Sequence, residues 1–261
     1  MNKGIIYIVV GERRFLEECL FSVAGLKKFC PDIGVTLFTD KTDVPSTYFD
    51  DIKLIDNDIN PFKNKVKYMY DSPYEYTLFL DSDTEIRQPI YELFELLDEH
   101  DLALAYSVQL DRSRFPTRLI SYADPNPYNK YNTGVVLYKK SDNLERFFAK
   151  WLDEVMAQDG KSMRSGNKGD QYYFNKLVSN KYHVDCNLKI ASFSNKIYNA
   201  RGSMIGHLQR NGEIKQVKIL HCHDLHKSWL IRQYRRINGR VSRDLFNFNR
   251  SLRKFSEHQT K

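Results

Sequence analysis

The sequence predicts an α/β protein with one mixed, mostly parallel β-sheet flanked by helices. Short apolar runs rich in β-branched and aromatic residues alternate with longer segments of helical periodicity, as a parallel sheet requires. The chain has 261 residues and 41% hydrophobic content, enough for one large core with at most a small appendage. We expect one large domain at residues 1–225 and a distinct segment at residues 226–261.

The first half of the chain alternates strands and helices regularly. The expected strands are residues 5–10, 35–39, 52–55 and 76–80. The helices between them are expected at residues 15–26 and 62–71, where apolar side chains recur on one face. This βαβ opening contains neither the Gly-x-Gly-x-x-Gly fingerprint nor the Gly-Lys-Ser/Thr phosphate loop. The sequence therefore favours neither a dinucleotide oxidoreductase nor a P-loop NTPase.

The second half continues the alternation around two long polar stretches. Strands are expected at residues 102–106 and 134–138, and helices at residues 91–97, 142–156 and 170–177. Residues 109–131 are polar, aromatic and proline-bearing, which is typical of a functional loop or lid. A second polar loop, at residues 159–169, joins the last two helices.

Two carboxylates follow the apolar strand at residues 76–80. Asp81 and Asp83 flank Ser82, and open α/β sheets bind ligands beyond the carboxyl ends of their strands. In extended geometry an Asp-x-Asp pair points both carboxylates the same way, which suits Mg²⁺ or Mn²⁺ better than zinc. The alternative is that Asp81 caps the following turn and Asp83 is merely solvated.

The net charge of +7 is concentrated at the carboxyl end of the chain. Residues 226–261 carry ten Lys or Arg against two acids, with aromatic and aliphatic residues at helical intervals. Such a basic amphipathic segment could lie on an anionic membrane surface, or its apolar face could pack on the body. Nucleic acid is a weaker candidate, because the body has no basic stripe or known binding motif.

The absence of long apolar runs and the spacing of the cysteines predict the cellular location and the state of the thiols. The sequence shows no long apolar run and no signal peptide, so we expect a cytoplasmic protein, peripheral at a membrane only through its basic tail. The four cysteines have no paired metal spacing and are expected to be free thiols.

Four separate segments together resemble the GT-A glycosyltransferases, and within them the retaining group similar to glycogenin and lipopolysaccharide galactosyltransferases (family 8-like). Asp81-Ser82-Asp83 resembles the Asp-x-Asp metal motif of that family, and Asn132-Thr133-Gly134 resembles its Asn-Ala/Ser-Gly segment. Asp170-Gln171 resembles its Asp-Gln pair, and residues 221–229 have the spacing of its His-x-x-Gly-x-x-Lys-Pro-Trp motif. The match covers most of residues 5–229, and its strength lies in the order of the set.

The resemblance implies a GT-A (Rossmann-like) fold, a catalytic domain at residues 1–225 and a role for each matching residue. Asp81, Asp83 and His221 would hold Mn²⁺ or Mg²⁺. Lys65 and Lys227 would contact the diphosphate of a nucleoside diphosphate sugar. Asn132, Asp170 and Gln171 would face the transferred sugar. Further donor contacts are expected from Val9, Gly11, Glu12, Phe15 and Ser82.

The implied reaction transfers a sugar, from a UDP-sugar by default, to a hydroxyl of a glycan or lipid-linked acceptor with retained anomeric configuration. Departures from the family pattern concern the diphosphate and the base. Asp224 stands for the usual Gly and Ser228 for the usual Pro, and the segment after the first strand lacks the usual Thr and Asn. Lys227 and the identity of the base are therefore less firmly implied than His221.

Other interpretations of the same residues stay open. A metal-dependent nucleotidyltransferase or phosphohydrolase also uses Asp-x-Asp, and a non-catalytic sugar-binding scaffold could share the fold. Taken singly, His221 could be an ordinary core histidine and Asp170 a helix N-terminal residue. His223 and His226, in the same segment as His221, could form a second metal site.

Overall fold

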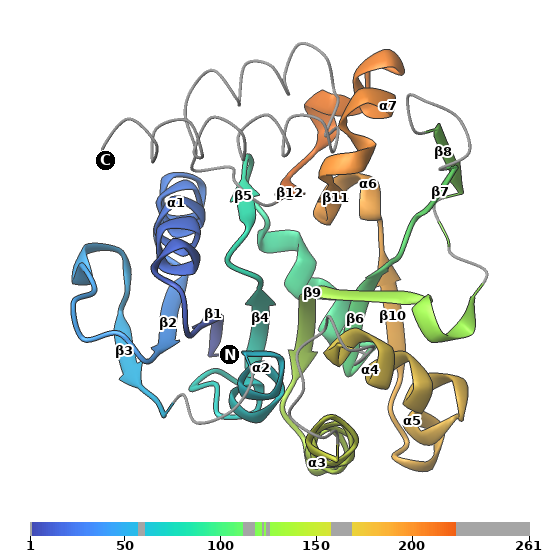
Figure 1. Ribbon diagram of the computed structural model, residues 1–261, viewed down its shortest axis with the longest axis horizontal. Helices are drawn as coiled ribbons and strands as arrows, with labels where there is room; N and C mark the ends of the chain where they lie inside the picture. The colour runs from blue at the N-terminus through green and yellow to red at the C-terminus, as the bar shows by residue number, and fades with distance from the viewer. Residues whose placement is uncertain are drawn as a thin grey trace, which may run out of the picture.

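The computed structural model describes residues 2–56, 61–111, 118–121, 123, 126–157 and 169–222. A seven-stranded sheet crosses the molecule (Figure 1). Its strands are, in spatial order, β10 (Ile190–Phe193), β6 (Leu102–Tyr106), β9 (Tyr131–Lys139), β4 (Tyr76–Leu80), β1 (Lys3–Val9), β2 (Gly34–Thr39) and β3 (Asp51–Leu54). Only β9 runs antiparallel to its neighbours, so the predicted mixed, mostly parallel sheet is confirmed.

Two smaller sheets accompany the large one. The first contains β11 (Ala200–Arg201), β12 (Ile219–His221) and β5 (Thr84–Ile86), and the second is the hairpin of β7 (Gln109–Asp111) and β8 (Arg118–Ser121). Because β5 follows β4 after three residues, the first small sheet lies directly beyond the carboxyl end of β4. It brings a distant part of the chain, residues 200–221, to that edge.

Helices cover both faces of the large sheet. The α-helices are α1 (Arg13–Phe29), α2 (Pro61–Met69), α3 (Asp142–Met156), α4 (Asp170–Ser179), α5 (Tyr182–Asp185), α6 (Asn195–Tyr198) and α7 (Ile205–Arg210). The 3₁₀ helices are η1 (Ser46–Tyr48), η2 (Tyr91–Asp98), η3 (Pro127–Asn129), η5 (Gly202–Met204) and η6 (Glu213–Gln216).

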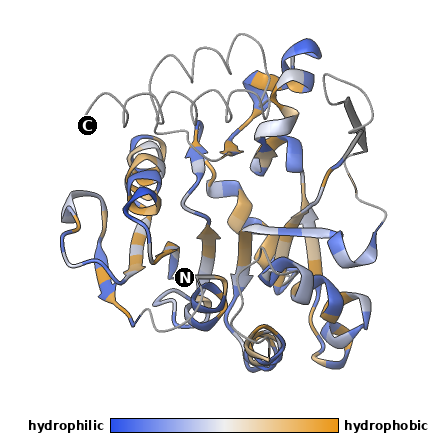
Figure 2. Ribbon diagram, viewed as in Figure 1, coloured by the Kyte–Doolittle hydropathy of each residue, from blue (hydrophilic) through white to orange (hydrophobic). Residues whose placement is uncertain are grey.

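Strand alternation decides which helices meet which face. Ile5 and Tyr7 of β1 point into a core shared with α1 and η2, whereas Ile6 points into a second core with α2, α3 and α4. The apolar colour of the central strands in Figure 2 matches this burial on both faces. A sheet covered twice is typical of parallel strands, whose side chains must be apolar in both directions.

Several predictions from the sequence need correction. Residues 91–97 were expected as a helix and form the 3₁₀ helix η2. The expected loop at residues 109–131 contains β7, β8 and η3 within its described part. The expected strand at residues 134–138 begins earlier, because Tyr131 and Asn132 already pair with Tyr106 and Ala105 of β6.

Other expectations have a plainer outcome. All four cysteines are free thiols, as expected, and all four are buried. Within the described residues, no helix combines the length and apolarity needed to cross a membrane. The loop at residues 159–168 and the whole basic segment at residues 226–261 lie outside the described residues, so the domain boundary stays a prediction.

Candidate metal and sugar-nucleotide site

The candidate site forms where β4 ends and β9 begins. Asp81 directly follows β4, and because β9 is antiparallel to β4, its first residues lie at the same edge. The backbone N–H of Asp81 donates to the carbonyl of Gly134 at 2.8 Å, which joins the two strands there. The edge is the one at which open α/β sheets bind ligands.

Three ligand groups of the kind that bind divalent cations meet at this edge. One ligand atom each of Asp81, Asp83 and His221 lies within 4.8 Å of the others. The Nε2 atom of His221 is 3.2 Å from Oδ1 of Asp83 and 3.8 Å from Oδ2 of Asp81. His221 comes from β12, so the small sheet delivers the ligand that is remote in sequence. The donor set, two carboxylates and one imidazole, fits Mn²⁺ or Mg²⁺.

Gly134 leaves the space in which these side chains meet. A β-carbon at this position would collide with Cε1 of His221 and lie 2.7 Å from its Nδ1 and 2.8 Å from Oδ2 of Asp81. No other residue type fits without moving a ligand. The glycine of the Asn132-Thr133-Gly134 segment therefore has a steric function in this chain.

A chain of hydrogen bonds fixes the tautomer of His221. The backbone N–H of Gly134 can only donate, so Oδ1 of Asn132, 3.1 Å away, accepts from it. The same Oδ1 accepts from Nδ2 of Asn199 at 2.8 Å, so the other end of Asn199, Oδ1, faces Nδ1 of His221 at 2.8 Å. Nδ1 must then carry a proton, which leaves Nε2 as the nitrogen that faces the two carboxylates and would bind a cation between them.

Lys65 links the metal ligands to the expected sugar-binding residues. Its ammonium lies 3.0 Å from Oδ1 of Asp81 and 3.1 Å from Oδ2 of Asp170. Burial lowers the pKa of Lys65, but the carboxylates of Asp170 and Asp81 outweigh it and raise the pKa above its ordinary value. With Asp83 included, three carboxylates and one ammonium leave a formal charge of −2, which a divalent cation would balance.

The predicted sugar-facing residues lie together. Nδ2 of Asn132 donates to Oε1 of Gln171 at 2.8 Å, and Nε2 of Gln171 donates to Asn129 at 2.5 Å. Oγ1 of Thr133 donates to Oδ2 of Asp170 at 2.8 Å. Asp170 and Gln171 begin α4, which is anchored because the buried Trp151 donates from Nε1 to the carbonyl of Asp170 at 2.9 Å. The amides are therefore held in fixed orientations.

A second polar chain supports the Asp81 to Asp83 turn from beneath. The hydroxyl of Tyr7 bonds to Ser22 of α1 at 2.8 Å, and Ser22 bonds to Thr84 at 2.7 Å. Thr84 in turn donates to the carbonyl of Asp81 at 2.9 Å. Burial raises the pKa of Tyr7, so this hydroxyl stays protonated. The chain is structural, and no pattern in the sequence predicts it.

The residues expected to contact the donor at the end of β1 and after it differ in their burial and in what they contact. Val9 is buried, so its side chain belongs to the core and only its backbone can serve a ligand. Gly11 has φ +87°, and its N–H donates to Oδ2 of Asp40 at 3.0 Å. Glu12 caps the start of α1 on the surface, and Phe15 packs against the core.

Some site residues were predicted, some were missed and some are not described. Ser82 is half-buried between the two carboxylates. Asn199 and Asp40 were not predicted as site residues. Asp40 ends a predicted strand and could have been found from that position, whereas Asn199 lies before a two-residue strand with no visible pattern. Lys227, and with it His223 and His226, lie outside the described residues.

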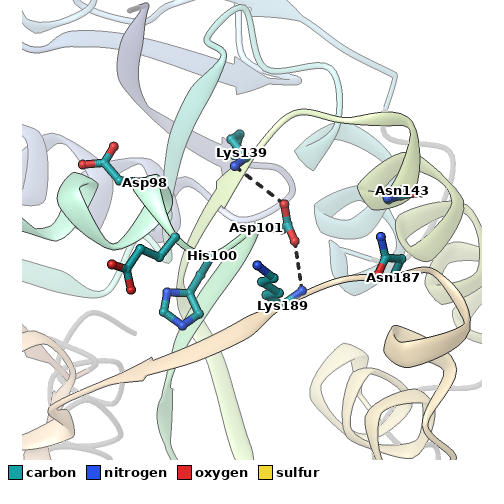
Figure 3. Close-up of a pocket in the computed structure, with 8 residues that line it drawn as sticks. Asp98, His100, Asp101, Lys139, Asn143, Asn187 and Lys189 are labelled. Atoms are coloured by element: carbon teal, nitrogen blue, oxygen red, sulfur yellow. Dashed lines mark hydrogen bonds and ion pairs between the residues drawn. The ribbon is translucent and has the colours of Figure 1, made fainter.

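A separate polar hollow of about 670 Å³ contains none of the predicted residues. It lies around Asp101, which pairs with Lys139 at 3.7 Å and accepts from the backbone N–H of Lys189 at 2.9 Å (Figure 3). Asp98 and Glu99 also line it. Its charges are of both signs and partly paired, and Lys139 ends β9 at the edge opposite the candidate site.

The sheet order, the antiparallel β9 and the acidic turn after β4 together have the arrangement of the GT-A glycosyltransferase fold. Two crystal structures of the glycosyltransferase GlyE of Streptococcus pneumoniae TIGR4, one of them the apo form, match at TM-scores of 0.55 and 0.53. Both are 20% identical and cover 88% of this chain and 55% of theirs. The apo structure of the bifunctional glycosyltransferase WbbM matches at 0.52, with 12% identity over 84% of this chain and 45% of its own.

The similarity to these structures is one of fold and covers only part of their length. The chain spans about half the length of the solved structures it matches. No protein-family description and no curated protein sequence matches the chain. At this level of identity, the comparisons show a shared fold, and function has to be argued from the site.

Proposed function

We propose that this protein is a metal-dependent glycosyltransferase. It would transfer a sugar from a nucleoside diphosphate sugar, with UDP as the default nucleotide, to a hydroxyl of a glycan or lipid-linked acceptor. The observation that carries the proposal is the meeting of Asp81, Asp83 and His221 within 4.8 Å, beside Asn132 and Gln171. The glycosyltransferase fold of the neighbours supports it.

The chemistry of sugar transfer accounts for each residue type. A diphosphate leaving group gains negative charge as the glycosidic bond breaks, and positive charge placed beside it lowers the barrier. A divalent cation held by Asp81, Asp83 and His221 would supply that charge as a Lewis acid. Lys65 is a cation of the chain itself at this site, and in this state its ammonium is shared by Asp81 and Asp170.

The amides and carboxylate beyond the metal ligands suit a sugar. Sugar hydroxyls bind through directional hydrogen bonds, and Asn132, Gln171 and Asp170 offer both donors and acceptors in fixed positions. Retention of the anomeric configuration is part of the proposal, with Gln171 next to the anomeric carbon and the leaving phosphate as the base. This part follows from the family resemblance of the Asp170-Gln171 pair.

Nucleotide binding is the first test of the proposal. Thermal unfolding would be measured with UDP, GDP, CMP and ADP sugars, with and without Mn²⁺, for the wild type and Asp83→Ala. A nucleotide that binds the native state raises its stability by mass action, by about 2.7 kcal/mol at one hundred times Kd. We expect a metal-dependent shift for one nucleotide, lost in the variant. A complete lack of shifts would contradict the proposal and favour a non-catalytic scaffold.

The reaction class needs a second measurement. NMR of the products should show a glycoside with the anomeric configuration of the donor. An inverted product would remove retention from the proposal. Release of sugar 1-phosphate instead of nucleoside diphosphate would favour the nucleotidyltransferase or phosphohydrolase alternative.

A further inference from the structure

A groove of about 660 Å³ lies beyond the carboxyl end of α4, between η3, α5 and the start of β10. Its walls include Lys130 and Tyr131, which lie between Asn129 and Asn132 of the candidate site. The ten-residue α4 starts at that site and ends at the groove, so the two are separated by about 15 Å at 1.5 Å rise per residue. A ligand of a few sugar rings could reach both.

The groove carries positive charge that has no ion-pair partner in the described part of the chain. Lys130, Lys181 and Lys189 line it, and no acidic residue does. None of these lysines has an ion pair with another residue in the described part of the chain. Lys189 also lines the neighbouring hollow of Figure 3, where Asp101 accepts from its backbone N–H and pairs with Lys139, whereas Lys130 and Lys181 line only the groove. A cluster of one sign attracts the opposite charge.

An aromatic platform holds one of these cations at the wall. The rings of Tyr106 and Tyr131 stack with centroids 5.2 Å apart. The ammonium of Lys130 lies 5.0 Å from the Tyr131 centroid and 5.8 Å from that of Tyr106. This cation–π contact fixes the position of the ammonium without neutralising its charge.

His183 adds a polar atom that lacks a partner. Its Nδ1 is buried and has no hydrogen bond among the described residues, and buried polar atoms are normally bonded. Burial lowers the pKa of His183, and the charge of Lys130 lowers it further, while Asp185 opposes both. An anion in the groove would accept a hydrogen bond from the protonated ring and reverse the effect of Lys130.

The backbone is strained at the same place. Among the described non-glycine residues, only Lys181 (φ 62°) and Asn187 (φ 54°) have a left-handed backbone, and both line the groove. Asparagine tolerates this conformation, but for lysine it costs on the order of 1 kcal/mol. The turn around α5 that carries Lys181 and His183 is thus held in a costly conformation at the groove wall.

We propose that this groove binds an anionic group, a carboxylate or a phosphate, carried by the acceptor saccharide. The acceptor of the proposed transferase is then a negatively charged glycan, with its reacting hydroxyl at the Asn132 and Gln171 end and its charge at Lys130, Lys181 and His183. This inference rests on the proposed function, but the binding it predicts does not require turnover. The volume lies within the usual range for ligand pockets.

The test measures binding of small charged sugars to the full-length protein without metal or nucleotide. Glucuronate and glucose 6-phosphate serve as the two anionic probes, and glucose as the neutral one, with calorimetry or NMR titration as the readout. The test variant combines Lys130→Gln with Lys181→Asn, because asparagine keeps the left-handed backbone while removing the charge. The control variant combines Lys28→Gln with Lys53→Gln, which lie on α1 and β3.

We expect at least one anionic probe to bind the wild type and the control variant with similar affinity. The same probe should bind the test variant at least tenfold more weakly, and glucose should bind none of the three proteins. Which probe binds identifies the carboxylate or the phosphate. Glucuronate binding should strengthen as the pH falls from neutral into the acidic range and lose this dependence in His183→Gln, since protonated imidazole attracts the anion. Equal binding to test and control variants, or no anion binding to the wild type, would overturn the inference.

The outcomes also separate this inference from the proposed function. UDP with Mn²⁺ should stabilise the test variant as much as the wild type, because the donor site is elsewhere. Loss of anion binding with intact donor binding supports the groove, and donor binding without any anion binding rejects the groove alone. Anion binding without donor binding in the wild type leaves the groove and rejects the transferase.

Discussion

Asn199 connects the candidate metal ligand His221 to the candidate sugar contact Asn132, one at each end of its amide. Partners of this kind orient a metal-bound imidazole and are commonly worth 10- to 100-fold in metal affinity. Because the backbone N–H of Gly134 can only donate, Oδ1 of Asn132 must accept, and the amide of Asn199 must therefore turn its NH₂ group toward Asn132 and its oxygen toward His221. Asn199 therefore keeps the proton of His221 on Nδ1, so that Nε2 faces the place where a cation would bind.

Replacing Asn199 with Leu should lower the affinity for Mn²⁺ by about 10- to 100-fold, because Nδ1 of His221 loses its acceptor. Calorimetry measures the affinity, and ¹⁵N NMR of the metal-free imidazole shows which nitrogen carries the proton. Asn199→Asp keeps an acceptor and should lose less. Asn195→Ala, at a buried asparagine that bonds to the carbonyl of Tyr106, controls for general damage. An unchanged tautomer and affinity in Asn199→Leu would refute this role.

Gly134→Ala should abolish Mn²⁺ binding, because its methyl group occupies the space between His221 and Asp81. Gly11→Ala is the matched control, since that glycine has a positive φ but no atom within 4 Å of an added β-carbon. The control should lose about 1 kcal/mol of stability from backbone strain and keep its metal affinity. Metal titration and urea unfolding of both variants distinguish the two effects. Retained Mn²⁺ affinity in Gly134→Ala would mean that the ligands can move apart.

At the scale of elements, a carboxylate of η2 helps to hold the segments around the small sheet. Glu92 of η2 accepts from the hydroxyl of Tyr198 at 2.7 Å and pairs with Lys218, which precedes β12. The backbone N–H of Lys218 donates to the carbonyl of Ile197 at 2.8 Å. Glu92 thereby ties the segments that carry Asn199 and His221 to the covering layer of the large sheet.

Glu92→Gln should destabilise the fold at neutral pH and have less effect in acid. Burial raises the pKa of Glu92, but hydrogen bonds from Lys218 and Tyr198 outweigh it and hold the pKa below its ordinary 4.5. The lowered pKa gives stability that is complete above pH 4.5 and disappears as the pH falls through the folded-state pKa. Since the side chain is 37% exposed, the effect is at most about 1 kcal/mol after solvent screening.

Urea unfolding of the wild type and Glu92→Gln between pH 3 and pH 7 tests this prediction. The difference in unfolding free energy should shrink toward zero as the pH falls below 4.5 and through the lowered folded-state pKa of Glu92. Lys176, which pairs with Glu154 far from the small sheet, supplies a control in Lys176→Gln. A difference that stays constant across the range would assign the effect to packing instead of charge.

Six of the seven strands of the large sheet could be predicted because each has a local signal, whereas the four-residue, mostly half-exposed β10 was missed. Residues 5–10, 35–39 and 76–80 are apolar on both faces, and that pattern reports burial directly. The two-residue β11 and three-residue β12 carry no such signal, because they exist only through pairing with β5. His221 could be placed from motif spacing, whereas Asn199 could not, because its role arises when distant segments pair.

The groove at Lys130 shows the same limit at a functional surface. Tyr106, Lys130 and Lys181 are far apart in the sequence and ordinary in composition. These side chains come together only through the pairing of β6 with β9 and the packing of η3 on α4. Long-range charge clusters of this kind are properties of tertiary structure, so a linear pattern does not reveal them.

At the scale of the whole molecule, the candidate metal site bridges two sheets. Asp81 and Asp83 follow β4 of the large sheet, and His221 ends β12 of the small one. A cation bound by all three would therefore oppose separation of the small sheet from the large one. The backbone N–H of Cys222, which donates to the carbonyl of Asp83 at 2.8 Å, reports on that separation.

Mn²⁺ should slow hydrogen exchange at Cys222 more than at Ile55, whose N–H donates to Thr39 at the β3 edge of the sheet. At one hundred times Kd, a cation that binds only the closed state stabilises it by about 2.7 kcal/mol, which slows exchange through that opening by about 100-fold. Exchange with mass-spectrometric or NMR detection gives both rates, and Asp83→Ala should remove the difference. Equal slowing at both amides would show that the cation stabilises only against global unfolding. An effect that survives in Asp83→Ala would show that Asp83 is not needed to hold the cation.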